Sequence, residues 1–68
     1  MTQKETVGTK IRSARHARRM TQHILAERTG VTRPQIANIE AGRCGVTIDR
    51  LGKIAEALGV KTIELVPE

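Results

Sequence analysis

The sequence predicts a single all-α domain of five helices. Two observations lead to this fold class. Apolar residues recur every three or four positions along most of the 68-residue chain, the spacing that puts them on one side of a helix. Threonines stand where several helices should begin and glycines where two should end, and these residue types favour such positions. We expect a small core, and modest stability unless two copies pair.

The first helix is expected over residues 7 to about 18. Val7, Ile11 and Ala14 recur at helical spacing and form its buried stripe. The polar residues 1 to 6 before it have no such periodicity, so we interpret them as a flexible lead-in.

Residues 21 to 40 predict a helix-turn-helix. A Thr oxygen can accept the free amide protons at a helix start, so Thr21 and Thr32 each begin a short helix. Gly30 lies where the chain must reverse, because glycine takes positive φ without steric cost, and Ala26 lies where the helices approach most closely. The apolar positions that face the partner helix and the rest of the domain are all filled, by Leu25, Val31, Ile36 and Ile39. A plain helical hairpin is the alternative, but the full pattern favours a DNA-binding geometry.

A loop and a fourth helix follow this motif. Residues 41 to 46 contain two glycines and no apolar period, which is typical of a loop. Thr47 begins the fourth helix, which reaches to about residue 58 and ends at Gly59. Its predicted buried face consists of Ile48, Leu51, Ile54, Ala55 and Leu58.

Residues 60 to 68 allow two interpretations. Ile63 and Leu65 alternate as in a strand, whereas Thr62 could begin a single helical turn that Pro67 ends. We favour the short fifth helix. A lone strand would leave its backbone unpaired unless a second copy paired with it, so both interpretations make this segment a candidate dimerisation tail. Its apolar residues exceed what one short segment can bury alone: Val60, Ile63, Leu65 and Val66.

Composition narrows the choice of partner. Twelve Lys and Arg against seven Asp and Glu give a net charge of +5, which favours a polyanion. The chain has no Phe, Tyr or Trp, the side chains that usually grip single-stranded nucleic acid, so duplex DNA is the expected partner. A single cysteine and the lack of a long apolar run favour a cytoplasmic location without a membrane span. No metal or cofactor is expected, because His16 and His23 have no partners at ligand spacing.

Several stretches resemble a known family: residues 11–15, 20–22 with 25–26, 30–32, 36–40 with 42, and 51–60. They are similar to the phage-repressor (Cro-like, XRE) helix-turn-helix DNA-binding family. The resemblance implies a five-helix, lambda-repressor-like domain that usually dimerises and represses or activates transcription. Two residues depart from the family pattern. Arg19 stands where glycine is usual, which costs about 1 kcal/mol if the backbone is left-handed there, and Pro34 stands where relatives often carry a base-reading side chain.

The candidates for base contact lie early in the second helix of the motif, because that part enters the major groove: Arg33, Gln35, Ala37 and Asn38. Arg33 could pair with guanine or bind a phosphate. Gln35 could equally fold back onto Thr32 as part of a capping box. Asn38 could contact adenine or remain an exposed polar group, and Ala37 could offer its methyl group to a thymine.

Other residues are expected to position the protein on the DNA backbone. Thr21 and Gln22 lie at the positive start of a helix, where a phosphate oxygen can be held. The resemblance places Arg43, Cys44 and Gly45 in a loop that approaches the backbone, although Arg43 could also be a solvated loop charge.

The resemblance further implies a structural ion pair between Arg15 and Glu40, bridging the first helix to the end of the third. The predicted function is a homodimeric transcriptional regulator, most simply a repressor that reads a two-fold operator. Two alternatives remain: the antitoxin of a toxin–antitoxin pair, and a protein-interaction module that bridges transcription factors. An enzyme is least favoured, because no paired carboxylates, activated nucleophile or metal constellation is present.

Overall fold

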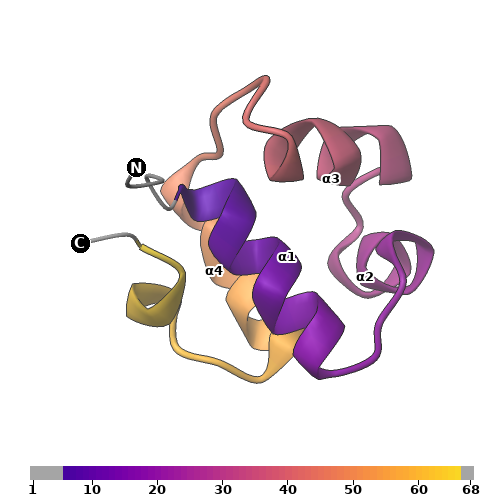
Figure 1. The fold of residues 1–68 in the computed structure, drawn as a ribbon, viewed down its shortest axis with the longest axis vertical. Helices are drawn as coiled ribbons and strands as arrows, with labels where there is room; N and C mark the ends of the chain where they lie inside the picture. Colours follow the sequence, from indigo (N-terminus) through magenta and orange to yellow (C-terminus); the bar gives the residue numbers. More distant parts are fainter. Residues whose placement is uncertain (1–5, 67–68) are drawn as a thin grey trace, which may run out of the picture.

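The computed structural model describes residues 6–66, which form four α-helices and a final 3-10 turn (Figure 1). The elements are α1 (Val7–Ala17), α2 (Gln22–Thr29), α3 (Arg33–Glu40), α4 (Ile48–Leu58) and η1 (Thr62–Leu65). The all-α class is confirmed, and residues 6–66 contain no strand. The predicted count of five α-helices is not confirmed, because the last element is a single 3-10 turn.

Each of the four α-helices begins at a threonine whose hydroxyl oxygen accepts a backbone N–H three residues on. Thr21 accepts from Ile24 at 3.0 Å, and Thr47 accepts from Arg50 at 3.2 Å. Thr6 does the same for Thr9 at 3.1 Å, so it is the cap of α1 and not part of a flexible lead-in. The local interaction of a capping hydroxyl therefore sets all four starts. The rest of the predicted lead-in lies outside the described residues.

All four α-helices end at a residue with a left-handed backbone, that of α3 at Gly42. Gly30 and Gly59 close α2 and α4 with φ of 76° and 72°, as predicted. After α1, Arg19 takes the same conformation, with φ of 55°. The N–H of Arg19 donates to the carbonyl of His16 and the N–H of Met20 donates to that of Arg15, both at 3.0 Å. These two bonds hold an arginine in the geometry that glycine adopts at lower cost.

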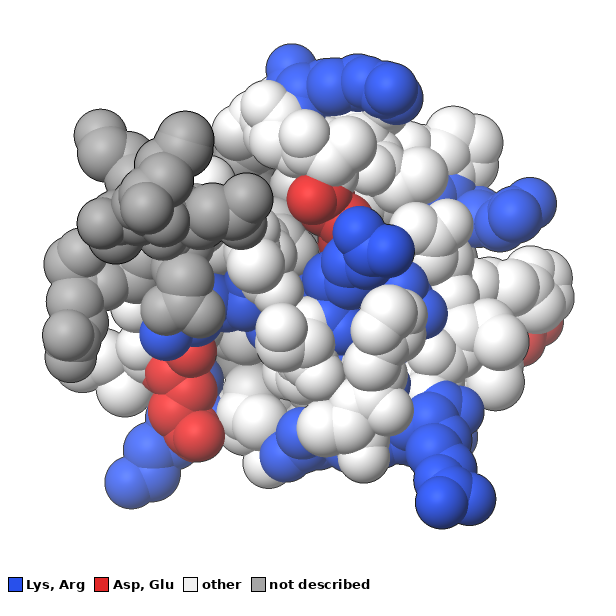
Figure 2. Space-filling model, viewed as in Figure 1, with Lys and Arg blue, Asp and Glu red and all other residues white. Residues whose placement is uncertain are grey.

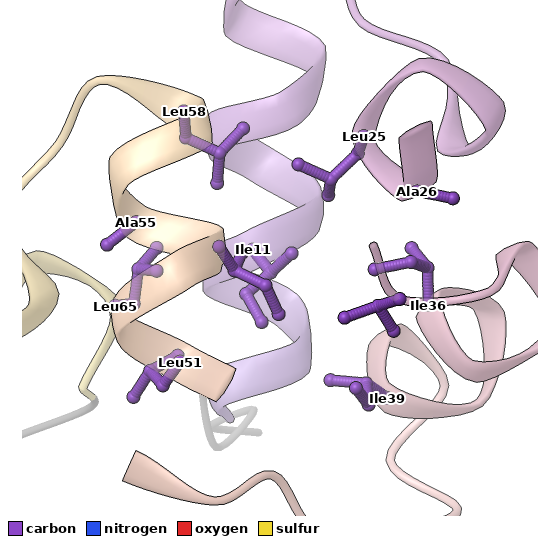
Figure 3. Close-up of a cluster of buried hydrophobic side chains, with 11 residues drawn as sticks. Ile11, Leu25, Ala26, Ile36, Ile39, Leu51, Ala55, Leu58 and Leu65 are labelled. Atoms are coloured by element: carbon purple, nitrogen blue, oxygen red, sulfur yellow. The ribbon is translucent and has the colours of Figure 1, made fainter. Parts of the chain in front are cut away.

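The core lies between α1 and α4 on one side and α2 and α3 on the other (Figure 3). Leu25, Val31, Ile36 and Ile39 of the predicted helix-turn-helix are all buried, as is Ala26. The fourth helix buries its predicted face from Leu51 onward. The predicted burial of Ile48 is wrong, because its side chain is 83% exposed. It is the first residue of α4, and the neighbouring elements pack on later turns of that helix.

The tail is organised by Leu65, which is 1% exposed and packs into the core beside α1 and α4. This corrects the assignment of Leu65 to a dimer surface, since its side chain is used within the chain. Thr62 is not the cap of this turn either. The N-cap is Lys61, whose N–H donates to Glu64 Oε2 at 2.8 Å, and Thr62 is the first residue of the turn. Pro67, which was expected to end the turn, lies outside the described residues.

α1 crosses α3 at a glycine. A Cβ atom on Gly8 would overlap the carbonyl oxygen of Ile39 and lie 2.9 Å from that of Glu40. Only glycine therefore allows this approach, which brings the end of α3 against α1. The sequence predicted no role for Gly8, because no neighbouring residue in the sequence indicates a contact with residues 39 and 40.

Candidate nucleic-acid interface

The turn between α2 and α3 is held rigidly. Thr29 Oγ1 donates to the carbonyl of Leu25 at 2.8 Å and accepts from the N–H of Val31 at 3.2 Å. The side chain of Val31 is buried in the core. Since the turn is held both by these hydrogen bonds and by the packing of Val31, the orientation of α3 relative to α2 is defined by the protein itself.

The first turns of α3 face solvent. Arg33, Pro34 and Gln35 are exposed, while Ala37 and Asn38 are half-buried. Ile36 and Ile39 anchor the opposite face in the core. All four candidates for base contact are therefore at least partly accessible, and the stretch Arg33–Gln35 is the most exposed part of the helix.

Gln35 closes the capping box that was one of its two predicted roles. Its N–H donates to Thr32 Oγ1 at 3.3 Å, and its Oε1 accepts from the N–H of Thr32 at 3.1 Å. A bidentate contact with adenine needs both the oxygen and the nitrogen of the side-chain amide. In this conformation the oxygen is already bonded, so Gln35 stabilises the start of α3.

The loop after α3 is bonded to the end of that helix. Gly42 has φ of 74°, and its N–H donates to the carbonyl of Ile39 at 3.1 Å. The N–H of Arg43 donates to the carbonyl of Asn38 at 2.9 Å. Arg43, Cys44 and Gly45 are all exposed. The structure thus places Arg43 directly beyond the C-terminus of α3, where its charge is free to face solvent.

Behind this surface lies a buried polar network. Arg15 Nε and Nη2 donate to the two carboxylate oxygens of Glu40 at 2.8 and 2.9 Å, with side chains only 8% and 4% exposed. Arg15 Nη1 donates to the carbonyl of Met20 at 2.8 Å. The ion pair that the resemblance implied is therefore present, and it connects α1, the chain before α2 and the end of α3.

Gln22 belongs to the same network, a role that the sequence analysis missed. Its Nε2 donates to Glu40 Oε1 at 3.2 Å. Its neighbour Thr21 is exposed and caps α2. A side-chain amide at the start of a helix gives no sequence signal for a carboxylate eighteen residues later. The same bond holds Gln22 at the N-terminus of α2, the position predicted to meet a phosphate.

Positive charge is spread widely over the face of the molecule seen in Figure 2. Figure 2 shows Lys and Arg side chains dispersed over one face, with acidic side chains at fewer places. Charge alone therefore does not indicate where DNA would bind, and the candidate interface rests on the geometry of α2 and α3. Within the described part of the chain, no helix is long and apolar enough to cross a membrane.

Comparison with known proteins agrees with this geometry. A family profile described as helix-turn-helix matches residues 11–65. The chain belongs to the Cro-like, XRE-type helix-turn-helix family. It is 36% identical over 63 residues to the immunity repressor protein of Bacillus phage phi105, a match that covers 93% of this chain and 44% of the repressor. The chain thus spans less than half the length of that relative, and its family is one of DNA-binding transcriptional regulators.

Solved structures show the same fold. The restriction-modification controller protein C.AhdI from Aeromonas hydrophila has a TM-score of 0.84 and 30% identity, covering 87% of this chain and 89% of C.AhdI. HEPD from Streptomyces albus, solved with 2-hydroxyethylphosphonate and Fe(II) bound, matches with a TM-score of 0.87 and 30% identity. That match covers 98% of this chain but only 15% of HEPD. The fold also occurs inside a larger enzyme, so function must be argued from the site.

Proposed function

We propose that this helix-turn-helix regulator is a repressor that binds a two-fold operator as a homodimer and acts in the cytoplasm. The observation that carries the proposal is the pairing of α2 and α3, with a bonded turn, a buried apolar face and an exposed start of α3. Such a helix can enter the major groove without rearrangement of the domain. The printed name of the phage phi105 relative, an immunity repressor, supports repression as the direction of regulation.

Base recognition is assigned to the accessible side of α3. Arg33, in the first turn, is the proposed reader of a guanine edge, and Asn38 the proposed reader of an adenine. Ala37 can contact a thymine methyl group. Gln35 preserves the helix start on which these contacts depend, and it contributes to base contact only if its capping bond opens.

Contacts with the DNA backbone are assigned to the two ends of the motif. Thr21 and Gln22 lie at the start of α2, where unpaired backbone N–H groups and the helix dipole favour a phosphate. Beyond α3, Arg43 supplies a positive charge, and the backbone amides of Cys44 and Gly45 supply donors. The Arg15–Glu40 pair holds these two groups at a defined separation.

Dimerisation is assigned to the apolar surface of the tail. Ile63 is 75% exposed and Val66 46% exposed, while Val60 is half-buried. With one small core per chain, pairing of these surfaces would add buried apolar area that the single chain lacks. A dimer would also place two copies of α3 on successive major grooves, which gives an operator with two-fold symmetry.

Selection of binding sites from a random duplex library tests the proposal. We expect a palindromic site to be enriched and to be bound by two chains. Arg33→Ala should then weaken cognate binding by about 1–3 kcal/mol and relax the preference at one base of each half-site. Arg28→Ala is the matched control, because it removes the same charge at an exposed position outside the proposed interface. Failure to enrich any duplex would overturn the proposal and favour an interaction module.

Phosphate contacts have a separate signature. Gln22→Ala should weaken binding to cognate and to random DNA by a similar factor. It should leave the selected sequence unchanged, because a phosphate contact carries no base information. Arg43→Ala should reduce the slope of log K against log salt by about one unit per subunit. A change of preferred base in the Gln22 variant would show that α3 docks differently.

A further inference from the structure

Gly52 lies within α4, and no close contact in the described part of the chain requires a glycine at this position. Glycine destabilises a helix interior relative to alanine, so a helical glycine usually marks a close approach of another group. Gly8 has such a reason in the backbone of α3. A Cβ on Gly52, in contrast, would meet nothing within 4 Å. The place of the missing side chain is therefore open space, called here the gap at Gly52.

Ile48 stands one helical turn before this gap. Residues four apart lie on the same face of a helix, so Ile48 and Gly52 are neighbours on the surface. Ile48 is 83% exposed, the largest exposure of any large apolar side chain in the described part of the chain. One face of α4 thus carries a large apolar side chain directly beside a gap.

We propose that a second copy of this chain covers the face formed by Ile48 and Gly52. A two-fold axis that passes between the two copies of α4, level with the midpoint of Ile48 and Gly52, places the two helices antiparallel. Ile48 of each copy then enters the gap at Gly52 of the partner subunit. In a two-fold interface, a residue that contacts another receives the same contact in return, so one projecting side chain and one gap on each copy are sufficient.

The charges beside this face fit the same arrangement. Asp49 and Lys53 are exposed and follow Ile48 and Gly52 by one residue each. They have the same four-residue spacing, so the antiparallel register that joins Ile48 to Gly52 also brings Asp49 of each copy near Lys53 of the other. Each of these two pairs therefore joins a negative and a positive side chain. This complementarity favours a second copy as the occupant, although each chain carries a net charge of +5.

The tail packs against the same helix that carries this face. η1 contacts α4, and the buried side chain of Leu65 lies beside the buried side chain of Ala55 (Figure 3). The exposed side chains of Ile63 and Val66 belong to this tail, so the interface can include them. The inference rests on the proposed homodimer and specifies where its centre lies.

Sedimentation of the full chain over a range of concentrations tests the inference. Gly52→Leu fills the gap and should weaken self-association by about tenfold or more. Gly52→Ala should raise the melting temperature at low concentration, because alanine favours the helix, and yet weaken self-association. A role in folding alone would not move these two quantities in opposite directions. Glu27→Leu is the control, because it introduces the same side chain at an exposed position of α2 outside the proposed interface, and it should leave self-association unchanged.

A charge exchange gives an independent test that does not require either variant alone to associate. Asp49→Lys and Lys53→Asp should each place like charges across the interface and weaken the homodimer. A mixture of the two variants should restore association, because each cross-chain pair then has opposite charges. Circular dichroism on each variant establishes that it is folded.

Two results overturn the inference in different ways. If the unsubstituted chain dimerises, Ile63→Ser disrupts it, and neither Gly52→Leu nor the charge exchange has an effect, then the interface is elsewhere and the homodimer stands. If the unsubstituted chain stays monomeric and binds a complete operator one to one, then the homodimer fails and this interface with it.

Discussion

Removal of the carboxylate of Glu40 should destabilise the domain strongly. Glu40 accepts two hydrogen bonds from Arg15 and one from Gln22, and its side chain is 4% exposed. In Glu40→Ala, the guanidinium of Arg15 stays buried and keeps only the carbonyl of Met20 as a partner. Removing one member of a buried pair costs about 3–5 kcal/mol, because the remaining charge is neither solvated nor paired.

The expected loss is a large part of the stability of a 68-residue domain. For a chain of this size, 1 kcal/mol lowers the melting temperature by about 4–8 °C, so the lower limit of about 3 kcal/mol corresponds to about 12–24 °C. Urea unfolding followed by circular dichroism gives the free energy directly. Arg15→Met together with Glu40→Leu should recover most of the loss, because an apolar pair of similar volume leaves no buried charge.

An exposed pair in the same domain is the control. His23 Nε2 lies 3.6 Å from Glu27 Oε2, and both side chains are 68% exposed. Glu27→Ala should change the free energy of unfolding by no more than about 0.5 kcal/mol. If Glu40→Ala cost as little as Glu27→Ala, the buried network would not be the structural link between α1 and α3 that the geometry indicates.

Three further substitutions test the fold and the start of α3. Gly8→Ala should cost about 3 kcal/mol or prevent folding, because the new Cβ overlaps the carbonyl of Ile39; Gly52→Ala, also helical but in open space, is the control, and equal melting temperatures would contradict the close approach. Arg19→Gly should stabilise the domain by about 1 kcal/mol, since it relieves a left-handed arginine; an unchanged denaturation midpoint would argue against that strain. Gln35→Ala should lower stability by about 1 kcal/mol while the selected DNA sequence stays the same, whereas an altered sequence would show that Gln35 reads a base.

The residues that form the candidate site could be predicted from the sequence, but the hydrogen bond that joins its two helices could not. The exposed start of α3 follows from Thr32 and from the apolar spacing behind it. That Gln35 uses its oxygen for capping was one of two predicted possibilities, and its two hydrogen bonds with Thr32 distinguish them. The bond between Gln22 and Glu40 could not be predicted, because it depends on how the start of α2 meets the end of α3.

The sequence by itself determined the four α-helices and most of their limits; the cap of α1 at Thr6 and the 3-10 form of η1 were not predicted. A threonine hydroxyl bonds an N–H three residues away, and Gly30 and Gly59 relieve a backbone strain that is confined to one residue. Such interactions act within one helical turn, so the order of residues contains all the information they need.

Only the tertiary structure decided which apolar and small residues meet another part of the chain. Ile48 has the helical spacing of a buried residue and is exposed, while Leu65 belongs to a tail that resembled a dimer surface and is buried. Gly8 and Gly52 are both helical glycines, and only Gly8 has a backbone against it. Burial and close approach depend on side chains tens of residues away, and their positions are fixed only when all helices pack together.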